Sequence, residues 1–158
     1  MYPVPLSRDK PRVLVVEDDW EIREAVVAIL VSEGYSVDSA PDGRAGLERL
    51  RERRPNVVVL DMMMPKANGW AFLAAKRKDL ELARIPVVVM SASDPIRPLR
   101  GVFAWMSKPF NFDELLKMLK PWSAPQSAAR VDRASGDQSP ASSSSGASSS
   151  EVTPARAR

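Results

Sequence analysis

The sequence contains no cysteine and no histidine. Without thiols it can form neither a disulfide nor a thiolate metal site. A metal site would have to use oxygen ligands, which favours Mg²⁺ over zinc. Long hydrophobic runs are missing too: no stretch approaches the length needed to cross a bilayer, and the N-terminus lacks the charged and apolar regions of a signal peptide. We therefore expect a cytoplasmic protein that does not insert into membranes.

A strong excess of one charge is also lacking. The 23 basic and 20 acidic side chains leave a net charge of +3, and they are dispersed along the chain. No stretch resembles a basic arm that would neutralise a phosphate backbone. The charge pattern therefore predicts no nucleic-acid partner.

Large apolar side chains become scarce near the C-terminus. From Pro121 to Arg158 there are eleven serines, eight alanines and four prolines, and the only large apolar side chains are Trp122, Val131 and Val152. Such a segment cannot bury enough apolar surface to offset the entropy lost on ordering. We expect an N-terminal extension at 1–10, one domain at 11–120 and a disordered Ser/Ala/Pro-rich tail at 121–158, with no output domain.

Strand and helix patterns alternate through residues 11–120. The expected strands are Arg12–Val16, Tyr35–Ser39, Val57–Asp61, Pro86–Met90 and Val102–Met106. The first expected helix has Ile22, Val26 and Leu30 on its apolar face and stops at Gly34. Further helices are expected over Gly43–Arg54, from Trp70 to about Leu82, and onward from an Asn111 cap with Glu114 three residues later. Continuous apolar strands are typical of a sheet covered on both faces. The pattern predicts an α/β fold, a doubly wound five-stranded parallel sheet of flavodoxin-like order 2-1-3-4-5.

Polar side chains follow four of these strands. They are the Glu17-Asp18-Asp19 group, Asp61, Ser91 and Lys108. Because the carboxyl ends of parallel strands share one edge, these groups should gather there. Glu17, Asp18 and Asp61 would repel one another unless a cation lay between them. The sequence thus predicts a Mg²⁺ and phosphoryl site, with Asp19 acting instead as a helix N-cap.

Four motifs in order resemble the response-regulator receiver domain of two-component signalling, the CheY-like superfamily, over about residues 11–120. They are Val15–Asp19, Leu60–Pro65 with Asn68-Gly69, Val89–Ala92, and Lys108–Phe110. The resemblance implies that Asp61 is the phosphoacceptor and that Lys108 binds the phosphoryl group, with a cis Lys108-Pro109 bond aiming the lysine inward. It implies Mg²⁺ ligation by Asp18, Asp61 and the Met63 backbone carbonyl, with Glu17 acting indirectly. It also implies Ser91 as switch hydroxyl and Trp105 as switch aromatic.

This resemblance implies a single-domain response regulator. It would accept a phosphoryl group from a histidine kinase or phosphotransfer protein and signal to a downstream protein by a surface change. It would assist its own phosphorylation and dephosphorylation without being a turnover enzyme. Two alternatives remain: a docking module that keeps the fold without phosphorylation, and a Mg²⁺-dependent phosphohydrolase. The chain is too short for a substrate cap, and Met63 cannot transfer protons, which disfavours the hydrolase.

One segment departs from the family. Lys108 follows Ser91 by only seventeen positions, fewer than the family usually has, and the stretch Asp94–Gly101 contains two prolines. Proline prevents a long regular helix. The fourth helix should therefore be shortened or absent, so the family's usual signalling face cannot be assumed.

Overall fold

The computed structural model describes residues 10–65, 68–93 and 99–123. The predictions for the N-terminal extension and for the tail beyond residue 123 lie outside the described residues. Within the described part of the chain, no helix combines the length and apolarity needed to cross a membrane.

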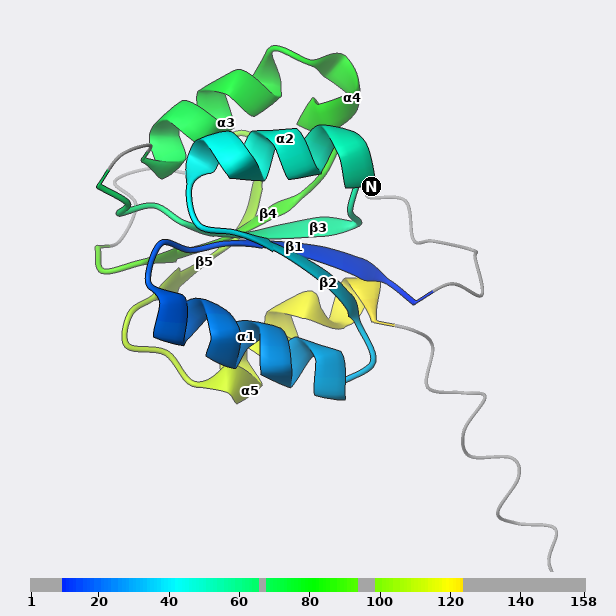
Figure 1. Ribbon diagram of the computed structural model, residues 1–158, viewed down its shortest axis with the longest axis vertical. Helices are drawn as coiled ribbons and strands as arrows, with labels where there is room; N and C mark the ends of the chain where they lie inside the picture. Colours follow the sequence, from blue (N-terminus) through cyan, green and yellow to red (C-terminus); the bar gives the residue numbers. More distant parts are fainter. Residues whose placement is uncertain (1–9, 66–67, 94–98, 124–158) are drawn as a thin grey trace, which may run out of the picture. The chain divides into compact units, whose positions relative to one another are not determined.

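A five-stranded parallel sheet forms the centre of the fold (Figure 1). Its strands are β1 (Arg12–Val16), β2 (Ser36–Ala40), β3 (Val57–Asp61), β4 (Val87–Ser91) and β5 (Val102–Ser107). Their order is β2-β1-β3-β4-β5, which confirms the predicted fold class. The strands β2 and β4 each begin one residue later than predicted.

Helices cover both faces of the sheet. They are α1 (Trp20–Ser32), α2 (Gly43–Arg53), α3 (Gly69–Arg77), the single turn α4 (Leu80–Ala83) and α5 (Phe112–Leu119), which is followed by a 3-10 turn η1 (Lys120–Trp122). Figure 1 shows α1 and α5 on one face and α2, α3 and α4 on the other. As predicted, Asn111 caps α5: its side chain accepts a hydrogen bond from the Glu114 N–H at 2.8 Å.

Two apolar clusters, one on each face, explain the continuous valine runs. In β1, Val13 and Val15 belong to the cluster that includes α1 and α5, whereas Leu14 and Val16 belong to the cluster that includes α2 and α3. Successive side chains of a strand point to opposite faces. Because both faces are covered, every position of the central strand β3 is buried.

The third predicted helix is not continuous, so the expectation of one helix from Trp70 to about Leu82 was wrong. The α3 helix ends at Arg77, and Asp79 starts α4 by accepting hydrogen bonds from the N–H groups of Glu81 and Leu82 at 3.0 and 3.2 Å. An aspartate side chain that binds the following amides favours a new helix start over helix continuation.

Packed structure extends slightly beyond the expected domain boundary at residue 120. Trp122 is only 2% exposed and lies edge-to-face against Phe103, with ring centroids 4.8 Å apart. Small and polar residues follow Trp122 in the sequence, so their composition led to the prediction that Trp122 belongs to the tail. Trp122 is therefore part of the core, whereas Lys120 and Pro121 of the same turn are exposed.

The connection between β4 and β5 lacks a long helix. Its described residues, 92–93 and 99–101, form bends and a turn, and residues 94–98 lie outside the described part. Gly101 occupies the turn with φ of 82°, a conformation that favours glycine. As far as the described residues extend, the predicted shortening or absence of the fourth helix is confirmed.

Candidate functional site

Two carboxylates lie side by side where β1 and β3 end. Val16 pairs with Leu60 across the two strands, so the next residues, Glu17 and Asp61, emerge as neighbours. Both are almost fully buried, at 1% and 2% exposure, whereas Asp18 is exposed. Carboxylate oxygens of all three residues lie within 4.8 Å of one another. The structure thus brings together the three acidic residues that the sequence grouped.

Lys108 reaches this acidic group from the loop after β5. Its Nζ lies 3.0 Å from Glu17 Oε2 and 3.4 Å from Asp61 Oδ2. The Lys108 backbone N–H donates to the Ser91 carbonyl at 2.7 Å, which fixes the loop to the end of β4. The Lys108-Pro109 bond is cis, as the resemblance implies. One ammonium therefore bridges two buried carboxylates.

The site is rich in negative charge. Burial, with the Asp61 charge adding to it, raises the pKa of Glu17 to about 7, although the hydrogen bond from Lys108 acts to lower it. Burial acts to lower the pKa of Lys108, but the hydrogen bond and charge of Glu17 and the charge of Asp61 raise it overall. A single ammonium set against three carboxylates leaves room for a further cation.

Backbone contacts fix the acidic loop after β1. Arg23 Nη1 donates to the Glu17 carbonyl at 2.7 Å and to the Asp18 carbonyl at 3.4 Å. Asp19 Oδ1 accepts from the Ile22 N–H at 3.0 Å, which confirms Asp19 as the N-cap of α1. Arg23 was not predicted from the sequence. Its only signal is its place one turn into the helix that follows the acidic group.

The loop after β3 orients Asp61. The Met63 N–H donates to Asp61 Oδ1 at 3.0 Å, while the Met63 side chain is 63% exposed and Met62 and Met64 are buried. A Cβ added to Gly69 would lie 2.5 Å from Met62 Sδ and 2.9 Å from the Asp61 carbonyl oxygen, so only glycine fits there. Metal ligation by the Met63 carbonyl stays a prediction.

A short hydrogen-bond chain leads from Ser91 to Trp105. Ser91, 1% exposed at the end of β4, accepts at Oγ from the Ser93 N–H at 3.3 Å. The Ser93 carbonyl accepts from Trp105 Nε1–H at 3.0 Å, and the half-buried indole packs on the α2/α3 side of the sheet. The sequence did not indicate Ser93, because its link to Trp105 uses a backbone carbonyl. The switch roles of Ser91 and Trp105 remain predictions.

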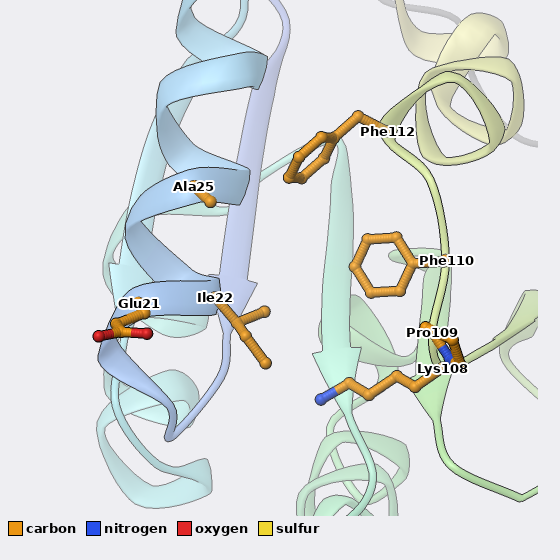
Figure 2. A pocket seen from close by; sticks show the side chains of 7 residues that line it. All are labelled: Glu21, Ile22, Ala25, Lys108, Pro109, Phe110 and Phe112. Atoms are coloured by element: carbon orange, nitrogen blue, oxygen red, sulfur yellow. The ribbon is translucent and has the colours of Figure 1, made fainter.

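An apolar groove adjoins Lys108 (Figure 2). Ile22 and Ala25 of α1 face Phe110 and Phe112 across it, and its volume is about 580 Å³. The two phenylalanine rings lie edge-to-face with centroids 6.2 Å apart. Polar groups border the groove at Glu21 and Lys108 only, so it offers an apolar surface beside the acidic site. The groove was not predicted from the sequence.

Comparisons with known proteins agree with this geometry. The model of the response regulator receiver domain family matches residues 13–120. Response regulator MprA of Mycolicibacterium vanbaalenii is 35% identical over 114 residues, covering 69% of this chain and 48% of that protein. Transcriptional regulatory protein DltR of Streptococcus agalactiae is 39% identical over 115 residues, covering 69% and 50%. The chain thus spans about half the length of these curated relatives.

Comparison with solved structures also finds response regulators. The chemotaxis response regulator CheY4 of Vibrio cholerae superimposes with a TM-score of 0.67 at 31% identity, covering 71% of this chain and 98% of that one. Receiver domains are signalling modules of two-component systems and not turnover enzymes. The acidic group of Glu17, Asp18 and Asp61 is compatible with the Mg²⁺ that such domains typically bind. This chain belongs to the response regulator receiver domain family.

Proposed function

We propose that this protein accepts a phosphoryl group on Asp61 and signals through the resulting change of its surface. The observation that carries the proposal is the position of the Asp61 carboxylate. It is buried beside Glu17 and Asp18, with one oxygen facing Lys108 Nζ at 3.4 Å and the other accepting from the Met63 N–H at 3.0 Å. A carboxylate held at both oxygens presents a fixed nucleophile.

The acidic group fits a hard divalent cation. Three carboxylate oxygens within 4.8 Å of one another, with no thiol or imidazole in the sequence, form a donor set suited to Mg²⁺. Asp18 and Asp61 would hold the ion together with the Met63 carbonyl, and Glu17 would act indirectly. A bound Mg²⁺ would neutralise the carboxylates and the charge that develops during phosphoryl transfer.

The chain's own side chains perform the rest of the step. An Asp61 carboxylate oxygen attacks the phosphorus in line, an O–P bond forms, and the bond to the donor group breaks. The donor leaves with the electron pair and takes up a proton. Lys108, already 3.4 Å from Asp61 Oδ2, pairs with the new phosphoryl oxygens. The Ser91 hydroxyl donates to another of these oxygens.

The surface change follows from the Ser91 contact. Turning Ser91 Oγ toward a phosphoryl oxygen ends its bond with the Ser93 N–H, and the Ser93 carbonyl holds Trp105 Nε1. The indole would therefore move with the loop after β4. A phosphoryl group shifts this equilibrium only by its different contacts in the two states.

Labelling with acetyl phosphate tests the acceptor assignment. The protein should be labelled only with Mg²⁺ present, Asp61→Asn should abolish labelling, and Lys108→Ala should keep labelling but lose the conformational change. Asp113→Asn, an exposed carboxylate in the first turn of α5, is the matched control and should be labelled normally. Undiminished labelling of Asp61→Asn would overturn the proposal. No labelling of the unaltered protein would favour a phosphorylation-independent docking module.

We propose a histidine kinase or phosphotransfer protein as the physiological donor. The apolar groove between α1 and Phe112 adjoins Lys108, so a helix of the donor seated there would bring its phosphohistidine to Asp61. Phe112→Ala should slow transfer from the donor protein and leave acetyl phosphate labelling unchanged. Val31→Ala, exposed on α1 and outside the groove, should change neither. Equal slowing with both phosphodonors would argue against docking in the groove. The lack of nucleic-acid binding stays a prediction.

A further inference from the structure

A buried ammonium lies far from the acidic site. Lys76 on α3 is 1% exposed, and its Nζ donates to the Ala83 carbonyl at 3.1 Å. Within the described residues, Lys76 forms no ion pair. An ammonium offers three donors, so one carbonyl leaves its charge uncompensated. Buried charges usually have a partner of opposite sign, which makes Lys76 an exception that needs an explanation.

A basic hollow lies against this ammonium. Its volume is about 540 Å³, and it is lined by Arg77, Ala83, Arg84, Arg100 and Gly101. Lys76 itself does not line the hollow, but its Nζ bonds the lining residue Ala83 and lies 3.9 Å from where a Cβ on Gly101 would be. Three arginines therefore line the hollow, and the buried Lys76 ammonium is bonded to one of its lining residues.

Within the described part of the chain, no carboxylate forms an ion pair with the arginines of this hollow. None of its lining residues is acidic, and none of the three arginines pairs with a carboxylate there. Asp79 and Glu81 at the start of α4 are the acidic residues nearest in sequence; Asp79 Oδ1 accepts from the backbone N–H groups of Glu81 and Leu82, and neither carboxylate pairs with an arginine of the hollow. On α2, by contrast, Arg44 pairs with Glu48 at 3.5 Å, which is the mixed pattern of a solvated helix face. The basic hollow is not such a face.

The hollow is separate from the phosphoacceptor site. Arg84 precedes β4 and Gly101 precedes β5, so both lie at the amino ends of these strands. Asp61 and Lys108 lie at the carboxyl edge of the sheet. The two sites therefore lie at opposite edges, and they carry opposite charge.

We propose that the basic hollow binds a small anion that carries a diphosphate group. One guanidinium group can donate two parallel hydrogen bonds to phosphate oxygens, and three guanidinium groups from separate segments can hold two adjoining phosphates. The volume lies within the usual range of about 300–1,000 Å³ for small-molecule sites, and is more than one phosphate needs. A bound anion would also place negative charge close to the buried Lys76 ammonium, without contacting it directly. No aromatic side chain lines the described hollow, so the diphosphate itself is the recognised group.

Isothermal titration calorimetry of the full chain with inorganic pyrophosphate, in Mg²⁺-free buffer with EDTA, tests the proposal. We expect one site per chain. The double variant Arg84→Gln, Arg100→Gln removes two exposed side chains and should weaken binding at least about tenfold, the loss expected for charge-assisted hydrogen bonds. The double variant Arg49→Gln, Arg51→Gln on α2 is the control and should bind as the unaltered chain does. The amide resonance of Gly101 should shift on titration.

Titrations with further ligands identify the source of the diphosphate. ADP binding as tightly as pyrophosphate, with AMP weaker, would place a nucleotide in the site. Pyrophosphate binding more tightly than ADP would point to the inorganic anion. The proposal would be overturned if citrate bound as well as pyrophosphate, or if duplex DNA competed more strongly than pyrophosphate. It would also be overturned if the Arg84/Arg100 double variant bound pyrophosphate as tightly as the unaltered chain. The absence of heat up to millimolar pyrophosphate at low salt would overturn it too. None of these results depends on phosphorylation of Asp61.

Discussion

The ammonium of Lys76 allows the cost of an unpaired buried charge in this fold to be measured. Burial lowers the pKa of Lys76 from 10.5 to about 8. Each pKa unit corresponds to about 1.4 kcal/mol, so keeping the Lys76 side chain protonated in the folded protein at pH 7 costs about 3 kcal/mol. Lys76→Met removes the ammonium and keeps an unbranched apolar stem. It also removes the hydrogen bond to the Ala83 carbonyl, a loss of about 1 kcal/mol.

We expect Lys76→Met to raise the free energy of unfolding by about 2 kcal/mol at pH 7, the difference between these two terms. The gain should depend on pH. Between about pH 8 and 10.5 the unfolded chain keeps the Lys76 proton and the folded chain does not. The stability contribution of Lys76 therefore rises with pH over that window. Below pH 8 the advantage of the variant should be constant, and it should shrink from pH 8 upward until it is lost.

Urea unfolding followed by tryptophan fluorescence at pH 7, 8, 9 and 10 measures this difference. Titrations elsewhere, including Tyr35, whose pKa is raised by burial, occur in both proteins and cancel. Lys78→Met changes the exposed lysine two residues away and should alter stability by less than about 0.5 kcal/mol at each pH. A Lys76→Met effect that is destabilising at pH 7, or that stays constant from pH 7 to 10, would refute the reasoning.

Three other predictions concern the metal, the C-terminus and the switch. Trp20 is 65% exposed and two residues beyond Asp18, so Mg²⁺ should change its fluorescence. Asp18→Ala should weaken that response at least about tenfold, because a direct ligand matters no less than the outer-shell partners whose loss costs that much. Calorimetry that detects no Mg²⁺ binding would make the acidic group purely structural. Deleting residues 124–158 should change the free energy of unfolding by less than about 0.5 kcal/mol. Trp122→Ala, by contrast, should lower it by about 3–5 kcal/mol because the indole is buried. A clear loss of stability on deletion would show that the tail docks on the domain. In a variant whose other tryptophans are replaced, acrylamide quenching of Trp105 fluorescence should fall when a phosphoryl mimic binds. Ser91→Ala should lose most of that change. Identical quenching with and without the mimic would show that Trp105 belongs to a fixed surface.

The sequence predicted the sheet well because its signals were local and redundant. Val57–Asp61 is apolar at every position up to the acidic residue, and such a run is compatible with few environments other than a doubly covered central strand. The same strand ends indicated Glu17 and Asp61 as neighbours, since the strand order alone brings them together. The break at Asp79 was missed because the apolar pattern continues to Leu82, while the competing signal is one side-chain cap.

Features made by the path of the backbone could not be predicted in this way. Lys76 is a charged residue on a helix, and its burial depends on how closely Ala83 and the turn at Gly101 approach α3. Ser93 interacts through its carbonyl, which every residue has. The basic hollow likewise gathers arginines from three segments that are unrelated in sequence. Local patterns do not encode such contacts.

The strand order also implies a gradient of rigidity across the sheet. Asp61 ends β3, the middle strand, which is paired on both sides and buried at every position. Lys108 follows β5, which lies at the end of the sheet and meets β4 through a register shift at Val87/Val88. Amide protons of β3 should therefore exchange only on global unfolding, while those of β5 exchange through smaller openings. Asp61 is therefore anchored at the doubly paired centre of the sheet and Lys108 is carried by an edge strand, so we expect a structural change that begins at Asp61 to spread toward β5.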